Sequence, residues 1–176
     1  AAFQGRAEVV KLLLAYGIDA NDVSVSDGFT PFHRTLWTNS ERHVETMRVF
    51  LEDGKVEVDF VSHVGKTGAL IATELKHTKV LDILLREYGA DPNFRNKRGD
   101  ALVHVAIRAQ DEKTLDMLLN NGADITLEDA KGKSCRKIAK QLRSKAVLER
   151  INRAFEELNT PNPNDNDRKE NRGEEL

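Results

Sequence analysis

The sequence predicts an all-α solenoid, in which repeated helical units stack in one direction, and three observations support this fold class. Two series of glycines run in step along the chain. The first is Gly28, Gly65, Gly99 and Gly132, spaced by 37, 34 and 33 residues. The second is Gly17, Gly54, Gly89 and Gly122, spaced by 37, 35 and 33 residues. Apolar residues recur at helical spacing between them. Periods of roughly 20 to 50 residues are typical of solenoids, whose units bury apolar surface against their neighbours.

A helix is predicted before each glycine of the second series. Apolar residues at i, i+3 and i+4 line one face of a helix. The clearest sets are Val9, Leu12 and Leu13; Leu81, Leu84 and Leu85; and Leu115, Leu118 and Leu119. A glycine such as Gly17 ends such a helix, because the left-handed conformation costs glycine least. The segments "GIDAN", "GADPN" and "GADIT" then predict turns that lead to the next unit.

The glycines of the first series open four matching segments: "DGFTPFHRTL", "VGKTGALIAT", "RGDALVHVAI" and "KGKSCRKIAK". Together with "LLREYGADPN" and "LLNNGAD", these segments resemble ankyrin repeats, whose pattern is Gly-x-Thr-Pro-Leu-His-x-Ala-Ala, a leucine-rich helix and Gly-Ala-Asp-x-Asn. The resemblance covers residues 1–158. It implies an ankyrin-repeat solenoid of helix-turn-helix units joined by β-hairpin-like turns. The units are about 1–23, 24–60, 61–94, 95–127 and 128–158.

The two ends and the second unit depart from this pattern. Ala1 and Ala2 align with the middle of a first helix, so we expect the parent protein to hold more repeats before them. The last unit is rich in Lys and Arg, and it is predicted to be a cap whose apolar stripe includes Val147 and Leu158. Residues 159–176 combine prolines, asparagines and charges, which predicts a disordered tail or linker. Extra residues in "WTNSERHVETM" predict a bulged turn, where His43 would lie.

The Gly65-Lys66-Thr67 triplet resembles the end of a nucleotide-binding phosphate loop. Such a loop needs a glycine five residues before the Gly-Lys pair, because closely turned backbone amides hold the phosphates. Phe60 occupies that place here, and Leu127 occupies it before Gly132-Lys133-Ser134. By similarity to ankyrin repeats, Gly65 makes a tight turn and Thr67 starts a helix. No cofactor is expected.

Composition excludes several classes of protein. The net charge is −2 in 176 residues, so nucleic acid is not the expected partner. No apolar run approaches the roughly eighteen residues of a membrane span. The lone Cys135 cannot form an internal disulfide, and the absence of a secretion signal at the first residues agrees with an intracellular protein, cytoplasmic or nuclear.

The histidines and the cysteine do not form a recognisable enzyme motif. His33 and His104 stand at the ankyrin histidine position, which implies hydrogen bonds to neighbouring turns. His77 matches the histidine between the two helices of a unit. Cys135 stands at a helix start without a positioned base, and there is no zinc-ligand cluster, so we expect neither catalytic nor metal-binding residues.

The resemblance implies that a partner protein binds to the concave surface, formed by the hairpin tips and the exposed side of each first helix. Cations gather at the tips of the later units, and the only tryptophan belongs to the second unit. A partner with an acidic segment and one apolar anchor would suit this composition. The expected contact residues are Asp27, Phe29, Trp37, Thr38, His63, Lys66, Glu74, Lys97, Arg98, Asp100, Arg108, Lys131, Lys133 and Gln141.

Other readings of these residues stay open. If this surface has no partner, the cations form a solvated rim and Trp37 packs on the bulged turn. The chain is either a monomeric adaptor or scaffold, or the substrate-recruiting segment of a larger enzyme or effector. Nucleic-acid binding would reveal itself by a steep salt dependence. Asn93 resembles the asparagine hydroxylation sites of ankyrin proteins, although asparagine is also a common turn residue.

Overall fold

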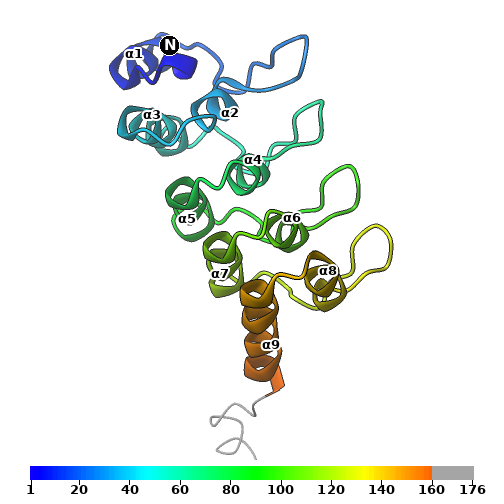
Figure 1. Cartoon of the computed structure of the whole chain (residues 1–176). Helices are drawn as coiled ribbons and strands as arrows, with labels where there is room; N and C mark the ends of the chain where they lie inside the picture. Colours follow the sequence, from blue (N-terminus) through cyan, green and yellow to red (C-terminus); the bar gives the residue numbers. More distant parts are fainter. Residues whose placement is uncertain (160–176) are drawn as a thin grey trace, which may run out of the picture.

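A computed structural model of the chain describes residues 1–159 as a stack of helix pairs. Figure 1 shows two columns of helices, with the connecting hairpins projecting beside the second of them. One column holds α1 (Ala7–Ala15), α3 (Glu41–Glu52), α5 (Thr78–Arg86), α7 (Glu112–Asn120) and the terminal α9 (Lys145–Asn159). The other holds α2 (Pro31–Thr35), α4 (Gly68–Glu74), α6 (Leu102–Arg108) and α8 (Cys135–Leu142), and a 3-10 turn, η1 (Ala2–Gln4), begins the chain. The predicted all-α solenoid is confirmed.

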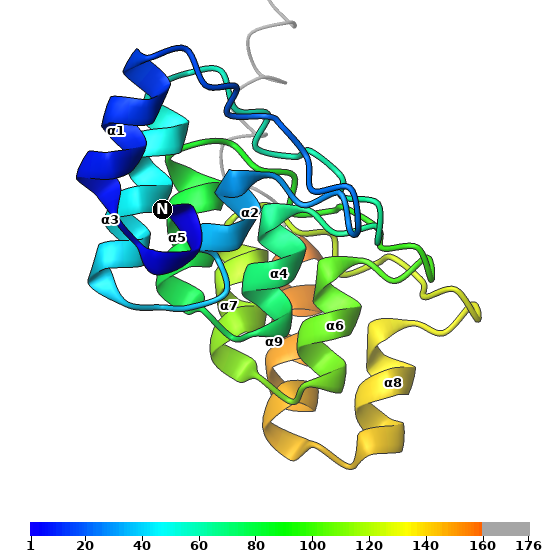
Figure 2. The same cartoon turned by 90° about the horizontal axis from the view of Figure 1, so that it is seen from above.

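Hairpin-like turns lead into α2, α4, α6 and α8 and project together on one side of the molecule (Figure 2). Backbone bonds of 3.0–3.1 Å close them, from the amides of Ser24, Ser62, Asn96 and Asp129 to the carbonyls of Phe29, Lys66, Asp100 and Lys133. Isolated antiparallel bridges extend two of these hairpins. The described residues therefore present four tips in register, one before each of α2, α4, α6 and α8.

The first helices begin at hydroxyl caps where the sequence supplies them. The Leu70 amide donates to Thr67 Oγ1 at 3.3 Å, and the His33 amide donates to Thr30 Oγ1 at 3.4 Å. Pro31 takes the first helical position of α2, where its missing N–H costs nothing. The predicted helix start at Thr67 is confirmed.

The glycines of the hairpin tips allow successive tips to pack closely. Gly28 has a φ of +65°, and a Cβ built there would lie 2.7 Å from the backbone nitrogen of His63 in the next tip. Gly65, with a φ of +79°, is covered in the same way by the side chain of Lys97. Each of these glycines therefore provides both a left-handed turn and room for the following unit.

Gly28→Ala is expected to destabilise the chain by about 2 kcal/mol, because it adds a clash to the strain of a left-handed alanine. Gly122→Ala is the matched control. Gly122 has a φ of +86° but no atom within 4 Å of a built Cβ, so only the strain of about 1 kcal/mol applies. Urea unfolding of the two variants measures the difference. Equal losses of stability would show that tip packing contributes nothing.

Two buried histidines, His33 and His104, and the partly buried His77 join neighbouring units, as the ankyrin resemblance implied. His33 Nδ1 accepts the Thr30 amide at 3.3 Å, and its Nε2–H donates to the carbonyl of Phe60, 27 residues later, at 3.2 Å. His104 makes the same pair of bonds, with the Ala101 amide at 3.0 Å and the Leu127 carbonyl at 3.1 Å. His77 precedes α5 and lies 3.0 Å through Nδ1 from the Leu36 carbonyl. These three histidines therefore stabilise the stack.

Burial of the predicted apolar faces depends on their place in the stack. Leu81, Leu84, Leu115 and Leu118 are fully buried, as expected. The corresponding face of α1 is different, because Val9, Leu12 and Leu13 are all more than a third exposed. The prediction of a helix there is correct, but among the described residues this part of its apolar face is left exposed.

The extra residues of the second unit lengthen a helix as well as a turn. α3 has 12 residues, whereas α5 and α7 have nine each. The expected place of His43 in a bulged turn is therefore wrong, because it lies in the first turn of α3. Its ring is buried between Ser40 Oγ at 2.6 Å and the Phe3 carbonyl at 3.1 Å. Both ring nitrogens of this buried histidine therefore have polar partners.

The last helix closes the stack with one buried and one exposed face. Val147, Ile151 and Ala154 are buried, whereas Leu158, expected on the same stripe, is exposed near the end of α9. Arg150 is only 7% exposed and forms an ion pair with Asp116 of α7. Asn159 is the last residue of α9, and the predicted tail after it lies outside the described residues.

Candidate functional site

Trp37 stands at the centre of a small aromatic cluster on the first-helix side of the second unit. Its ring lies edge-on to Phe29, with centroids 5.5 Å apart. The Arg34 guanidinium lies 5.3 Å from the Phe29 centroid and 5.2 Å from the Trp37 centroid. Asp27 holds that guanidinium by bonds of 2.8 and 3.0 Å. The cluster orients Trp37 and leaves 41% of the residue exposed.

Two of the expected contact residues have supporting roles in this cluster. Phe29 is only 7% exposed, so it lies beneath Trp37 and presents almost no surface to a partner. Asp27 is engaged by Arg34 and by the Phe29 amide at 3.1 Å. Thr38 follows Trp37 and is exposed. Arg34 was not predicted from the sequence as part of this site. Its position one helical turn after Thr30, on the short helix α2, could have indicated that it lies near the hairpin.

A shallow pocket of about 260 Å³ lies beside Trp37, between the second and third units. Its apolar walls are Trp37, Phe29, Ile71 and Leu75, and Leu75 is itself half-exposed. Lys66 and Glu74 form its polar edge and make an ion pair with each other. The pocket can therefore accept an apolar side chain. Ile71 and Leu75 were not among the expected contact residues.

Three of the six cations among the expected contact residues are engaged within the chain by acids or by a backbone carbonyl. Lys66 pairs with Glu74, and the Lys97 ammonium donates to the His63 carbonyl. Arg108 bridges Asp100 at 2.9 Å and Asp129 at 2.6 Å. Backbone amides of Lys133 and Lys131, together with Arg108, hold the pKa of Asp129 below its usual value. The charges of Lys66 and Arg108 are therefore compensated, whereas Lys97 is bonded to a neutral carbonyl.

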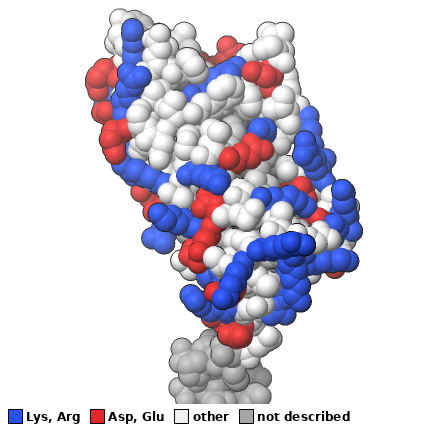
Figure 3. All heavy atoms as spheres, viewed as in Figure 1, with Lys and Arg blue, Asp and Glu red and all other residues white. Residues whose placement is uncertain are grey.

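Arg98 and Lys131 are different. Both are exposed, and neither side chain makes an ion pair among residues 1–159. The Lys133 ammonium donates to the neutral Gln141 at 2.9 Å, so its charge also stays uncompensated. Figure 3 shows Lys and Arg gathered along the hairpin side of the later units. The uncompensated cations named here, Arg98, Lys131 and Lys133, belong to the fourth and fifth units.

Asn93 is held at both ends of its side-chain amide. Its Nδ2 donates to the Gly122 carbonyl at 3.2 Å, and its Oδ1 accepts the Asp124 amide at 2.7 Å. Asn21, at the same position of the first unit, donates to the Lys55 carbonyl at 2.7 Å. These bonds give the asparagine a stacking role between turns, independent of the hydroxylation predicted by resemblance.

The phosphate-loop triplet is part of a closed turn. The Gly65 amide donates to the Ser62 carbonyl at 2.8 Å, and the Lys66 amide donates to Ser62 Oγ at 3.1 Å. The Lys66 ammonium is occupied by Glu74. Because these donors are used internally, the turn has no open nest of amides with which to hold a phosphate.

Cys135 is fully buried at the first residue of α8, and burial raises the pKa of its thiol to about 12. A thiol in this state is a poor nucleophile. Among the described residues, no group of three His, Cys, Asp or Glu side chains is placed to hold a metal ion. No helix within residues 1–159 has the length and apolar character needed to cross a membrane.

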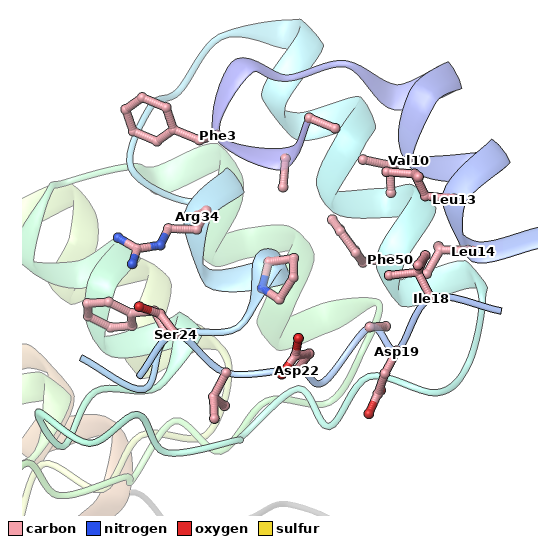
Figure 4. Close-up of a pocket in the computed structure, with 16 residues that line it drawn as sticks. Phe3, Val10, Leu13, Leu14, Ile18, Asp19, Asp22, Ser24, Arg34 and Phe50 are labelled. Carbon is pink, nitrogen blue, oxygen red and sulfur yellow. The ribbon is translucent and has the colours of Figure 1, made fainter. Parts of the chain in front are cut away.

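A hollow of about 400 Å³ lies at the N-terminal end of the stack (Figure 4). Val10, Leu13 and Leu14 of α1 face Phe50 of α3 across it, with Arg34 at the far side. Arg34 is paired with Asp27, and Asp19, Asp22 and Ser24 are the other polar residues of the lining. The hollow is therefore lined mainly by apolar residues of η1, α1 and α3.

Two sequence profiles match the chain. The profile described as "Ankyrin repeats (3 copies)" matches residues 40–129, and "Ankyrin repeats (many copies)" matches residues 1–51. The chain is also 40% identical over 79 residues, 45% of its length, to the "Inactive serine/threonine-protein kinase TEX14" of Bos taurus. That alignment covers 5% of the bovine protein.

Two further similarities extend over more of the chain. The human "SH3 and multiple ankyrin repeat domains protein 1" is 32% identical over 73% of this chain, and the alignment covers 6% of that protein. The "Palmitoyltransferase AKR1" of Lachancea kluyveri is 28% identical over 84% of this chain and is covered for 20% of its length. The chain thus spans a fifth or less of each of these proteins.

Proposed function

Because this chain belongs to the ankyrin repeat family, we propose that it is a non-catalytic interaction module that binds a partner protein through its concave surface. Stacked repeats offer an extended surface instead of an enclosed pocket. The interaction domain is residues 1–158, and the module acts as a monomeric adaptor or scaffold inside the cell. The partner is a protein, and neither nucleic acid nor a membrane is part of the complex.

The exposed Trp37 carries this proposal. It is a large apolar side chain, 41% exposed, held in one orientation by Phe29 and Arg34 beside an apolar pocket. Aromatic residues held rigidly beside pockets are enriched among the hot spots of protein interfaces. Arg98 and Lys131, on the hairpin tips of the fourth and fifth units, add uncompensated positive charge. A partner with an acidic segment and one apolar anchor is complementary to both features.

An alternative is that the chain recruits a substrate or a regulator to a larger enzyme. Two of the similar proteins are named as an inactive kinase and a palmitoyltransferase, and both are much longer than the matched region. In that arrangement the same surface binds the recruited protein, while catalysis belongs to another domain. The reading frame of the parent gene distinguishes an adaptor from a recruiting segment.

Affinity capture from a cell lysate with quantitative mass spectrometry tests the proposal. The test variant combines Trp37→Ala, Arg98→Glu and Lys131→Glu, which changes three exposed side chains without touching the buried Phe29 or the engaged Lys97. We expect it to retain less than about a tenth of the partner held by the wild-type chain, because it removes the anchor and reverses two charges.

The control variant combines Leu158→Ala, Lys113→Glu and Arg153→Glu. These residues are exposed on the second-helix column and make no ion pair among the described residues. Circular dichroism first establishes that both variants are folded. Retention of the same partners by all three proteins would refute binding through the concave surface.

A further inference from the structure

We infer that the concave surface contains two adjoining subsites, which select an extended partner segment with an apolar side chain and a carboxylate about three residues apart. This inference rests on the proposed function and deepens it. The anchor subsite is the pocket beside Trp37, and the acid subsite is the hollow beside Arg98.

The anchor subsite is shaped for one apolar side chain. Its volume of about 260 Å³ suits a large aliphatic or aromatic group, and Trp37 and Leu75 form its two exposed walls. Both are partly exposed apolar residues that a partner would desolvate. Phe29, buried behind Trp37, prevents that wall from collapsing inward.

The acid subsite is the next hollow along the stack, about 240 Å³, and it has a different lining. Lys97 and Arg98 of the following tip face it, together with Asn96. The Lys97 ammonium is already bonded to the His63 carbonyl, whereas Arg98 makes no ion pair within residues 1–159. Its guanidinium is therefore the group available to a carboxylate, which it can bind through two parallel hydrogen bonds.

The Lys66–Glu74 ion pair separates the two subsites, since both residues line both hollows. Because the two charges compensate each other, this wall neither attracts nor repels a neutral segment that crosses it. Glu74 borders both hollows, but only the acid subsite adds an unpaired cation, Arg98. Arg98 therefore favours the acid on its own side, and the apolar walls beside Trp37 favour the apolar group there.

The spacing follows from the repeat. Neighbouring helices pack about 10 Å apart, and an extended chain advances roughly 3.3 Å per residue. A segment that crosses from one unit to the next therefore needs about three residues between the anchor and the acid. Lys131, on the tip after Arg98, would meet a second carboxylate after a similar step.

A random twelve-residue peptide library, selected on the chain and followed by titration of tryptophan-free synthetic peptides, tests this inference. Trp37 is the only tryptophan, so its fluorescence reports directly on the anchor subsite. The selected peptides are expected to carry an apolar residue and an Asp or Glu about three positions apart, and their binding is expected to shift Trp37 emission to shorter wavelength. Arg98→Glu should weaken binding by about tenfold or more, and Lys113→Glu, on the opposite column, by less than about twofold.

The inference would be overturned by selected peptides that lack this pair or that leave Trp37 emission unchanged. It would also be overturned if Arg98→Glu and Lys113→Glu changed peptide binding equally, or if the selection yielded no binder. Lysate capture separates this failure from a failure of the proposed function. If capture still depends on Trp37, Arg98 and Lys131, the concave surface binds its partner by another geometry. If capture does not depend on them, both proposals fail.

Discussion

Lowering the pH from 7 to 4 is expected to reduce the free energy of unfolding by about 3 kcal/mol or more. The cause is the pair of buried histidines that join neighbouring units. Burial lowers the pKa of His33 from its ordinary 6.5 to about 4, and burial also lowers the pKa of His104. Each Nδ1 accepts a backbone amide, of Thr30 and of Ala101, so a proton on that nitrogen breaks the bond.

The sign of the effect follows from proton uptake. Between pH 6.5 and about 4, the unfolded chain binds protons on these imidazoles that the folded chain does not bind. The contribution of these two histidines to stability is therefore fully present above pH 6.5. It decreases as the pH falls toward their pKa values in the folded chain. Carboxylates with lowered pKa values, such as Asp129, add their own loss at still lower pH.

Urea unfolding at a series of pH values, followed by circular dichroism, measures this loss. His33→Asn is the comparison, because an amide oxygen can still accept the Thr30 amide but does not titrate in this range. The variant should lose less stability than the wild type between pH 6.5 and 4. An identical pH dependence in both proteins would contradict the role assigned to His33.

Asp116→Ala is expected to destabilise the chain by about 3 kcal/mol, more than the replacement of its partner by Arg150→Met. Arg150 is 7% exposed between α7 and α9, and its ion pair with Asp116 compensates the buried guanidinium. Without Asp116, the acidic group that remains beside Arg150 is Glu157, whose carboxylate lies 3.8 Å from the guanidinium. Uncompensated charge inside a protein is costly because it is poorly solvated.

Arg150→Met removes the buried charge together with its need for a partner. Asp116 is 44% exposed through its side chain, so water can solvate it after the change. We expect a loss below about 1.5 kcal/mol, typical of an apolar replacement of similar volume. Thermal and urea unfolding of both variants at pH 7 decide the order. A larger loss for Arg150→Met would show that the ion pair itself stabilises the cap.

The regular part of the fold was predictable because each unit repeats the same local chemistry. Glycine spacing predicted the turns, Thr67 predicted a helix start, and His33 predicted a bond between units. What a repeat pattern does not contain is the effect of position in the stack. Val9 and Leu84 carry equivalent apolar character, but Leu84 is buried between units and Val9 lies at the end of the stack.

The candidate site was less predictable, because availability depends on contacts between units. Sequence placed Lys66, Arg98 and Arg108 on one surface but could not show that Lys66 and Arg108 are paired with acids. Arg108, for example, meets Asp129, which is 21 residues away in sequence. Phe29 was expected at the surface and is buried, since Trp37 and Arg34 cover its ring.

Hydrogen exchange of the chain, alone and with its captured partner, tests the central claim of binding through the concave surface most directly. We expect slower exchange at the amides of the hairpin tips, including Val64, Lys97 and Lys131, and around Trp37. Amides on the outer faces of α3, α5 and α7 should exchange at unchanged rates. Slower exchange confined to those outer faces, with unchanged tips, would contradict the claim.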